Sequence, residues 1–383
     1  MSETIVRQDL FISRTKGYYT YRIPGLVATR KGTLLAYCEA RLGRGGDWDP
    51  IDICMRRSFD DGRTWSDPKV VVDHLDFEEN EPTNNFVCIV DRINNTVHTL
   101  FCQNYARVFT SKSSDDGQSF TAPREITHYF ESLREHYPWR VIAIGPGHGI
   151  QLSTGRLLAS LWMSDGTGTE FGPNRLGHRP SEVGVVYSDD HGETWECSGI
   201  VVPNKGPIRN PSESCLAELP DGRVILNTRS ESYQHRRLVS LSDDHGTTWS
   251  NPEFDDQLLE PICMASMVSD NESHSQDLIF ANPGVLERSF QKNASDNRPL
   301  LTKKGIPYDR KQLTVRQSKD MGDSWAQSRV LESGPSGYSD LAIQGDEIFC
   351  LYECGMNERM YDTKSLRLAR FNRDWILATG SMG

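Results

Sequence analysis

The sequence of 383 residues lacks long hydrophobic runs and a basic leader. No stretch approaches 18 apolar residues, and the opening MSETIVRQDLF holds no basic region followed by an apolar run. Because a helix that crosses a bilayer needs about 20 apolar residues, we expect no membrane span. We also expect no signal peptide within this chain. The expected location is cytoplasmic by default, or secreted or periplasmic if a leader has been removed.

Cysteine pairs and positive charge are also scarce. The nine cysteines form no CxxC pair, and their odd number leaves at least one unpaired. We therefore expect reduced thiols, with neither a disulfide framework nor a metal site. The formal net charge is −11. Since phosphate binding needs a basic face, nucleic acid is not an expected partner. An anionic small substrate would have to be held by a local cluster of arginines.

Extended helical periodicity is absent, and short β-rich runs take its place. Examples are GLVATR, GTLLAYCEA, GRLLASLWM, GRVILNTRS and DEIFCLYEC, many of them separated by turn dipeptides such as KG, TG and DG. Hydrophobic residues make up 37% of the chain and eight of its residues are tryptophan, which is enough material for a packed core. The pattern predicts an all-β fold.

One octapeptide pattern, Ser-x-Asp-x-Gly-x-Thr/Ser-aromatic, recurs along the chain. Its copies are SFDDGRTW (58–65), SSDDGQSF (113–120), SDDHGETW (188–195), SDDHGTTW (242–249) and SKDMGDSW (318–325). Their first residues are separated by 55, 75, 54 and 76 positions, so about one copy falls in each four-stranded unit. Units of this kind arranged around an axis make a β-propeller, with about six blades if one blade lacks the motif.

The octapeptide itself predicts a hairpin turn rather than a catalytic site. Glycine supplies a positive φ, serine and aspartate bond to backbone groups within the loop, and the aromatic residue packs into the interior. We therefore interpret Asp190, His191, Asp244 and His245 as turn residues. A propeller can be an enzyme or a binding module, so the repeat predicts the fold and leaves the function open.

Charged and phenolic residues outside the repeats are the candidates for chemistry. Arg22 precedes an apolar strand in TYRIPGLVAT, and Asp47 is preceded by three glycines in GRGGDWD. Glu213 stands at the start of one predicted strand and Arg229 at the end of the next. Arg310 precedes the strand that enters the fifth octapeptide. Tyr338 completes the set, in the Gly/Ser-rich turn SGPSGYSDLAI; each of these residues taken alone would more often be a surface or packing residue.

Taken together, these stretches resemble a known family. The motifs YRIPGL, GPGHGIQL, ELPDGRVILNTR, RKQLTVRQS and GYSDL, with five Asp boxes, stand in the order found in the non-viral exo-α-sialidases (neuraminidases), of bacterial type. The resemblance spans residues 10 to 370. It implies a six-bladed β-propeller with four-stranded antiparallel blades and five Asp-box turns. It also implies a single catalytic domain over residues 1–383.

The resemblance assigns roles to these residues by their numbers here. Arg22, Arg229 and Arg310 match the arginine triad that holds the carboxylate of the sugar. Tyr338 matches the nucleophile, and Glu213 matches the glutamate that activates it. No metal and no cofactor is implied.

Three further assignments follow from the same resemblance. Asp47 matches the acid/base residue, although Asp49 and Asp52 lie close by and the sequence does not separate Asp47 from Asp49. Arg41 matches a further arginine near the substrate, and Glu353 matches the glutamate that steadies the first arginine. The segment after Met163 does not align. Four other residues are candidates to line the pocket: Glu39, His148, Asp165 and His178.

The implied activity is retaining hydrolysis of terminal α-linked sialic acids through a covalent tyrosyl intermediate. We expect the chain to act as a monomer. The implied substrates are sialylated oligosaccharides, glycoproteins or gangliosides. The sequence leaves linkage preference open, as well as three alternatives: preference for a deaminated sialic acid (KDN), a trans-sialidase or anhydro-forming variant, and a propeller that binds sialic acid without cleaving it. Retention of Glu213, Tyr338 and Asp47 argues against the last.

Overall fold

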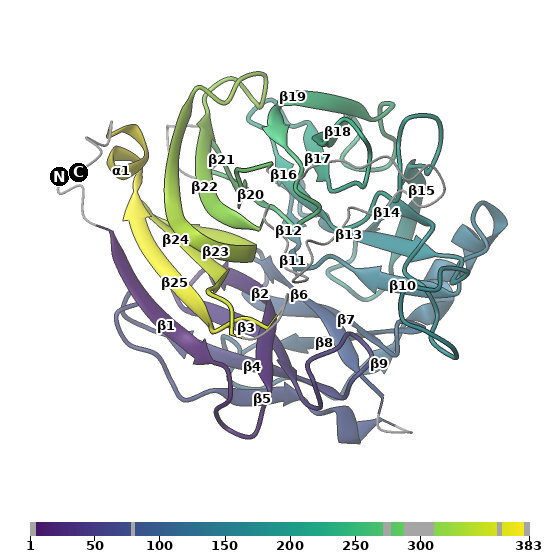
Figure 1. Cartoon of the computed structure of the whole chain (residues 1–383), viewed down its shortest axis with the longest axis horizontal. Helices are drawn as coiled ribbons and strands as arrows, with labels where there is room; N and C mark the ends of the chain where they lie inside the picture. Colours follow the sequence, from purple (N-terminus) through teal and green to yellow (C-terminus); the bar gives the residue numbers. More distant parts are fainter. Residues whose placement is uncertain (1–4, 78–80, 271–276, 287–309, 358–361, 379–383) are drawn as a thin grey trace.

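Strands dominate the computed structural model, which describes residues 5–77, 81–270, 277–286, 310–357 and 362–378. The strands form sheets placed around a common centre, near which β2, β6, β11, β12 and β16 lie (Figure 1). Three short helices lie within the described residues: η1 (His74–Asp76), η3 (Thr127–Glu135) and α1 (Arg373–Leu377). The predicted all-β, propeller-like fold is confirmed. No helix in the described parts of the chain is long and apolar enough to cross a membrane.

Four sheets follow one another along the chain, each built mainly from consecutive antiparallel strands. The first contains β2 (Thr20–Ala28), β3 (Leu34–Arg41), β4 (Ile51–Ser58) and β5 (Lys69–Val72). The second contains β6 (Thr83–Asp91), β7 (Thr96–Gln103), β8 (Arg107–Ser113) and β9 (Arg124–Glu125), with β11 (Gly147–His148) paired in parallel to β6. The third contains β10 (Val141–Ile144), β12 (Ile150–Gln151), β13 (Leu157–Ser164), β14 (Ser181–Ser188) and β15 (Glu196–Val202). The fourth contains β16 (Ser214–Glu218), β17 (Val224–Thr228), β18 (Arg236–Ser242) and β19 (Glu253–Leu259).

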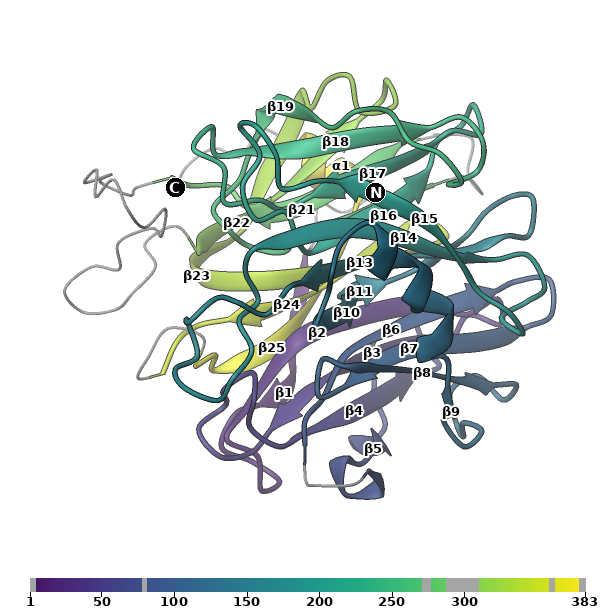
Figure 2. The same ribbon diagram turned by 90° about the vertical axis from the view of Figure 1, so that its right-hand side faces the viewer.

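The last sheet joins the two ends of the chain. Its seven strands are β20 (Ser266–Ser269), β21 (Leu278–Pro283), β22 (Lys311–Ser318), β23 (Gln327–Gln344), β24 (Glu347–Cys354), β25 (Ser365–Asn372) and β1 (Val6–Ile12). The first half of the long strand β23 pairs with β22, and its second half pairs with β24. Because β1 pairs with β25, the first and last strands lie side by side (Figures 1 and 2) and close the ring.

The five octapeptides adopt the turn that the sequence predicts. In the fourth copy, Ser242 Oγ donates to Asp244 Oδ1 at 2.9 Å and accepts from Gly246 N at 2.8 Å. The same carboxylate accepts from Thr248 N at 2.8 Å and from Thr248 Oγ1 at 2.7 Å. His245 and Gly246 both have positive φ, of 59° and 88°. The corresponding positions of the other four copies also have positive φ: Asp61 and Gly62, Asp116 and Gly117, His191 and Gly192, Met321 and Gly322.

The glycine of each octapeptide lies against the preceding sheet. A Cβ on Gly246 would stand 2.5 Å from Leu158 of β13, and a Cβ on Gly117 would stand 3.0 Å from Leu35 of β3. The nearest atom to a Cβ on Gly322 would belong to Ile225 of β17. The repeated motif therefore has a structural role, because it turns the chain and seats each sheet on its neighbour.

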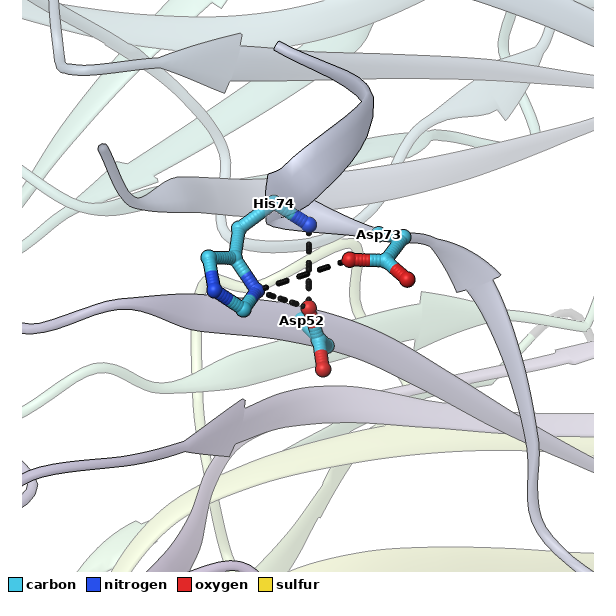
Figure 3. A group of neighbouring side chains, drawn as sticks. All are labelled: Asp52, Asp73 and His74. Carbon is cyan, nitrogen blue, oxygen red and sulfur yellow. Dashed lines mark hydrogen bonds and ion pairs between the residues drawn. The ribbon is translucent and has the colours of Figure 1, made fainter. Parts of the chain in front are cut away.

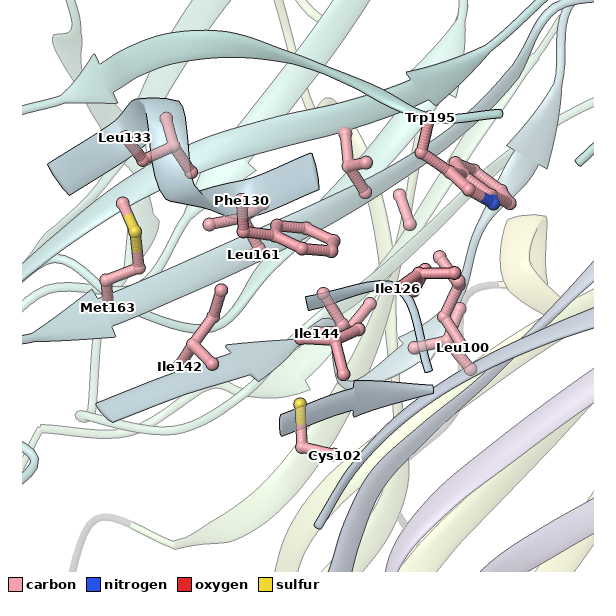
Figure 4. Close-up of a cluster of buried hydrophobic side chains, with 14 of the residues drawn as sticks. Leu100, Cys102, Ile126, Phe130, Leu133, Ile142, Ile144, Leu161, Met163 and Trp195 are labelled. Atoms are coloured by element: carbon pink, nitrogen blue, oxygen red, sulfur yellow. The ribbon is translucent and has the colours of Figure 1, made fainter. Parts of the chain in front are cut away.

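Large apolar clusters fill the space between adjacent sheets. In one cluster (Figure 4), Leu100 of β7 and Ile142 of β10 pack with Leu161 of β13, and Phe130 of η3 covers them. Trp195, the aromatic residue of the third octapeptide, is 1% exposed in the same cluster. Burial of a side chain of this size stabilises the fold by about 1.5–3 kcal/mol. The predicted packing of the octapeptide aromatic is confirmed at this position.

Candidate active site

Five of the predicted residues come together at one end of the innermost strands. Arg22 lies near the start of β2, and Glu213 directly precedes β16. Arg229 directly follows β17, Arg310 directly precedes β22, and Tyr338 lies in the second half of β23. All five are at most 9% exposed. Residues from separate sheets can meet only near the axis of a ring, so this gathering depends on the fold.

Tyr338 stands at the centre of the cluster. Its hydroxyl group donates to Glu213 Oε1 and accepts from Arg229 Nη1 at 2.7 Å. Arg229 also forms an ion pair with Glu213, and its backbone N donates to Glu213 O at 3.1 Å. Burial raises the pKa of the phenol far above its usual value; Arg229 opposes that rise and Glu213 adds to it. The free phenol is therefore neutral, and the carboxylate beside it is placed to accept its proton.

Two more guanidinium groups lie over the ring of Tyr338. The Cζ atoms of Arg22 and Arg310 are 5.2 Å and 5.1 Å from the ring centroid. Arg310 Nη2 donates to Ile262 O at 2.7 Å. A guanidinium group matches a carboxylate with two parallel hydrogen bonds and does not lose its charge. Three of them around one phenol have the charge and the hydrogen-bond donors to bind a carboxylate.

Glu353 of β24 fixes both the first arginine and the tyrosine. Its Oε1 accepts from Arg22 Nε at 2.9 Å, and its Oε2 accepts from the backbone N of Tyr338 at 3.2 Å. The carboxylate leaves no room for a side chain at Gly337, where a Cβ would stand 2.2 Å from Oε2. The close approach explains the glycine in GYSDL.

Two isoleucines beside the arginines have a strained backbone. Ile23 and Ile262 have φ of 56° and 58°, which is rare for a β-branched residue and costs about 1–3 kcal/mol each. Ile23 follows Arg22 at a bulge in β2, and the carbonyl of Ile262 accepts from Arg310. The strained backbone therefore occurs directly after Arg22 and at the carbonyl group that accepts a hydrogen bond from Arg310.

Asp47 lies beside this cluster, in the loop between β3 and β4. Its Oδ1 accepts from Arg41 Nη1 at 2.7 Å, and its side chain is 31% exposed. Arg41 also donates to Glu39 Oε2 at 2.6 Å and to Gly45 O at 3.0 Å. Burial raises the pKa of Asp47, but the positive charges of Arg41 and Arg22 and the hydrogen bond from Arg41 outweigh burial and hold the pKa well below its usual range.

The two nearby aspartates are engaged elsewhere. Asp49 Oδ2 accepts from the backbone N of Arg44 and of Gly46, at 2.9 Å and 2.8 Å, and so shapes the loop. Asp52 is buried, and its Oδ2 accepts from Tyr18 Oη at 2.6 Å. Of the three aspartates, Asp47 is therefore the one that bonds to Arg41 and whose charge interacts with Arg22.

Asp52, Asp73 and His74 form the group of possible metal ligands found among the described residues (Figure 3). Asp52 Oδ1 already accepts from His74 N at 2.9 Å and from His74 Nδ1 at 2.6 Å. Asp73 Oδ1 accepts from Leu75 N and caps η1. These bonds use the oxygens that would bind a cation, so the group serves to attach η1 to β4.

An aromatic group beside Asp47 was not predicted from the sequence. The ring of His178 lies 4.5 Å from Tyr105, 4.5 Å from Phe171 and 6.0 Å from Trp48, between ring centroids. Burial lowers the pKa of His178 to about 4 despite the charge of Asp47, so the ring is neutral near pH 7. His178 is the member of this group that the sequence singled out, as a candidate to line the pocket, and the position of Trp48 directly after Asp47 is a further signal that could have found the group.

Two of the pocket candidates lie outside the cluster. Asp165 Oδ1 accepts from Thr167 N and Thr167 Oγ1, within its own turn. His148 Nδ1 bonds to Asp340 Oδ1 at 2.8 Å, further along the axis. The other two candidates lie at the cluster. Glu39 accepts a hydrogen bond from Arg41, and His178 interacts electrostatically with Asp47.

Comparisons with known proteins identify the family of this chain. The BNR repeat-like domain model matches residues 32–350. The sialidase of Bacteroides fragilis strain YCH46 is 29% identical over 381 residues, covering 91% of this chain and 62% of that protein. Sialidase-3 of Rattus norvegicus is 28% identical, covering 95% of this chain and 94% of that protein. The chain belongs to the sialidase (neuraminidase) family. It spans less than two thirds of the Bacteroides relative.

Solved structures of sialidases share the fold. The Hadza microbial sialidase Hz136 superposes with a TM-score of 0.78 at 23% identity, covering 97% of this chain and 69% of that one. The intramolecular trans-sialidase of Ruminococcus gnavus superposes with a TM-score of 0.72 at 15% identity, covering 97% and 98%. At these identities the likeness establishes the propeller-like fold and not the reaction.

Proposed function

We propose that this member of the sialidase family is a retaining exo-α-sialidase that releases terminal sialic acids from glycoconjugates. The observation that carries the proposal is the hydrogen-bonded group of Tyr338, Glu213 and Arg229, with Arg22 and Arg310 over the tyrosine ring. A binding site for an anionic sugar would need the arginines alone. A buried tyrosine bonded to a carboxylate is what a covalent mechanism requires in addition.

In this mechanism the arginines hold the substrate. Sialic acid carries a carboxylate on its anomeric carbon, and Arg22, Arg229 and Arg310 would bind it through paired hydrogen bonds. Glu353 compensates the charge of Arg22 in the free protein, at 2.9 Å. The anomeric carbon would then lie next to the hydroxyl of Tyr338, which is in contact with Arg229.

Tyr338 would attack the anomeric carbon. A carboxylate nucleophile would be repelled by the carboxylate of the substrate, and sialidases use a tyrosine in its place. Glu213 would take the phenolic proton as the oxygen–carbon bond forms. The three arginines stabilise the phenolate character that develops on the oxygen.

Asp47 would act as acid and then as base. It would protonate the departing glycosidic oxygen and later remove a proton from the water that cleaves the tyrosyl intermediate, which gives retention of configuration. In the free protein Arg41 holds Asp47 as a carboxylate. The 31% exposure of its side chain leaves Asp47 accessible to an arriving sugar, which would separate it from Arg41 and allow its protonation.

We further propose that the ring has six blades, in one catalytic domain over residues 1–383. Each of β4, β8, β14, β18 and β22 ends at the serine of an octapeptide, and each is followed by a fourth strand. In this count β23 belongs to two blades, and the sixth blade consists of its second half with β24, β25 and β1. That blade has no octapeptide. We propose a monomer, which light scattering of the purified chain would test.

The structural neighbours supply two alternative outcomes. One is the Ruminococcus gnavus intramolecular trans-sialidase, and the leech enzyme of that type was solved with 2,7-anhydro-Neu5Ac. In such a reaction a hydroxyl of the sugar itself intercepts the tyrosyl intermediate. Another neighbour, the Trypanosoma rangeli sialidase, was solved with a difluoro derivative of KDN. Product analysis and a deaminated substrate therefore belong in the first experiment.

The test is hydrolysis of a fluorogenic α-ketoside of N-acetylneuraminic acid, with NMR of the first product. We expect release of the α-anomer of the free sugar by the wild-type protein. Tyr338→Phe should lower kcat by at least about a hundredfold, because it removes the nucleophile. The matched control is Tyr187→Phe, which removes another hydroxyl bonded to a glutamate, Glu196, at 3.0 Å in the outer part of the third sheet. The control should keep wild-type kcat.

Three results would contradict the proposal. A 2,7-anhydro product would identify an intramolecular transferase, and a first-formed β-anomer would exclude the double displacement. If the protein binds the sugar but hydrolyses neither the N-acetylneuraminic acid substrate nor its KDN analogue, it is a lectin.

A further inference from the structure

Asp340, two residues after Tyr338, connects four elements at the axis. Its Oδ2 accepts from the backbone N of Leu26 in β2 at 2.8 Å. Its Oδ1 accepts from Ser266 Oγ of β20 and bonds to His148 Nδ1 of β11, both at 2.8 Å. Ser266 Oγ in turn accepts from the backbone N of Leu341 at 2.9 Å. Asp340 is 1% exposed, and the mechanism above does not use it.

The strand that carries Tyr338 is irregular where the tyrosine stands. The pairing of β23 with β24 shifts register between Ser336 and Ser339 and resumes with Ser339 opposite Tyr352 and Asp340 opposite Leu351. Tyr338 thus lies in a bulge, where the ladder does not fix its backbone. The backbone N of Tyr338 is held by Glu353 on one side of the bulge. On the other side, Asp340 is the residue whose side chain ties the strand to its neighbours.

Side chains at Tyr338 and Asp340 point to the same face, because residues two apart in a strand do so. Both therefore face the axis, with Tyr338 at the arginine end. Met264 packs against Tyr338, and a Cβ on Gly147 would meet Met264 at 2.7 Å and Asp340 Oδ1 at 3.2 Å. Tyr37 Oη donates to Gly147 O at 2.7 Å and accepts from Cys88 N at 3.0 Å. The layer below Tyr338 is thus closely packed and fully bonded around the carboxylate.

Below this layer the axis opens into a cavity of about 360 Å³. His148 lines it, together with Leu26 of β2, Leu216 of β16 and Leu341 of β23. Along β2, β16 and β23 these three leucines stand three or four positions after Arg22, Glu213 and Tyr338, so the cavity lies further along the strands than the site. Asp340 and His148 separate the two spaces.

We propose that Asp340 and His148 position the nucleophile: their pair fixes the bulge of β23 so that Tyr338 Oη stays on Glu213 and Arg229, and it closes the floor of the site. The inference rests on the proposed function. Asp340 is a positioning residue, because it acts through the strand and does not touch the substrate. His148 is the histidine of the GPGHGIQL motif, and no catalytic step requires it. The positioning role explains why this histidine is present.

Asp340→Asn is the most informative variant, because it keeps the size of the side chain but cannot accept from all three of its present partners. An asparagine supplies one oxygen, so its amide must face either Leu26 N–H or the pair of Ser266 and His148. The backbone donor cannot turn away, so the amide nitrogen must face Ser266 and His148, and both of their bonds to Oδ1 are lost. Asp340→Asn should therefore fold with a perturbed bulge, and Asp340→Leu, which removes all three acceptors, should perturb it more.

We expect Asp340→Asn to lower kcat by roughly ten- to a hundredfold, since misplacement of a reacting group by about 1 Å costs that much. KM should stay within about threefold, because the arginines are untouched. His148→Leu should behave like Asp340→Asn. His148→Asn, whose amide can still donate to Asp340, should restore most of the lost kcat.

The matched control is Asp91→Leu. Asp91 is also fully buried, accepts from His191 Nδ1 at 2.7 Å and from Gln151 Nε2 at 2.7 Å, and lies at the far end of β6. Asp91→Leu should lower the Tm and leave kcat unchanged. A loss of kcat equal to that of the Asp340 variants would overturn the proposal, as would wild-type kcat in Asp340→Asn.

Crystal structures of the wild type and Asp340→Asn separate this inference from the proposed function. We expect Tyr338 Oη to move away from Glu213 in the variant, whether or not the wild type hydrolyses sialosides. An inert wild type would end the functional proposal, while the position of Tyr338 in the variant would still decide the positioning role. An unmoved Tyr338 would overturn it.

Discussion

Individual residues of the site are organised as buried ion pairs. Arg22 is paired with Glu353, Arg229 with Glu213, and Arg41 with both Glu39 and Asp47. Removing one partner of a buried pair leaves an uncompensated charge and costs about 3–5 kcal/mol. Variants at these positions therefore need a stability measurement beside each rate. Substitutions that keep size and hydrogen bonding are the informative ones.

The charge of Arg41 predicts a pH effect. A cation next to a carboxylate favours its ionised form, so Arg41→Gln should raise the pKa of Asp47 by about 1–3 units. The basic limb of the kcat/KM profile, where the acid loses its proton, should move to higher pH by a similar amount. Arg44→Gln is the control, because Arg44 is an exposed cation of the same loop. A basic limb that does not move would show that Asp47 is not the acid.

At the scale of elements, the octapeptide turns explain how the sheets stack. The serine and aspartate close the turn, and two consecutive residues with positive φ bring the backbone close to the preceding sheet. The conformation tolerates several residue types at the first of these two positions, where the chain has Asp61, Asp116, His191, His245 and Met321. The histidines of the repeat are therefore there for the turn.

Two glycines with the same φ of 88° allow the packing to be measured separately from the backbone strain. A Cβ on Gly222 would have no atom within 4 Å, whereas a Cβ on Gly246 would stand 2.5 Å from Leu158. Gly222→Ala should cost about 1–2 kcal/mol from its left-handed backbone alone. Gly246→Ala should cost about 1–3 kcal/mol more, because it overpacks the contact between sheets. Urea unfolding gives both values; equal costs would mean that Leu158 simply moves aside.

For the whole molecule, stability depends on closing the ring. β1 pairs with β25 from Val6 opposite Arg370 to Ile12 opposite Ser365, and Leu10 and Phe11 are buried at 3% and 2% exposure. Asp9 accepts from Ser365 Oγ at 2.9 Å and forms an ion pair with Arg367 at 2.7 Å. The strand therefore covers an edge that would otherwise be open.

Deleting residues 1–12 should lower the free energy of unfolding by more than the roughly 3–5 kcal/mol expected for Phe11→Ala alone. It should also promote self-association, because the exposed edge of β25 can pair with another chain. Calorimetry and light scattering measure the two effects. An unchanged Tm in the longer deletion would show that the ring holds without β1.

Much of this architecture was predictable because its signals are local. The octapeptide contains its own turn-forming groups, and alternating apolar runs between copies indicate strands, so the all-β propeller-like fold followed from the sequence. Arg22, Glu213, Arg229, Arg310 and Tyr338 were singled out by the family resemblance, and they do gather in the structure, although their catalytic roles remain predictions. Trp48, Phe171 and Tyr105 were missed because their meeting around His178 depends on loops from different sheets.

The sequence by itself determined the repeat, its turns and the residue types available for the site. Only the tertiary structure decided that Asp47 bonds to Arg41, that Asp49 and Asp52 are engaged elsewhere, and that Asp340 bonds to His148. The physical reason is separation along the chain. Turns and strand patterns arise between residues a few positions apart, whereas the site joins residues hundreds of positions apart, such as Arg22 and Glu353, which meet only when the ring closes.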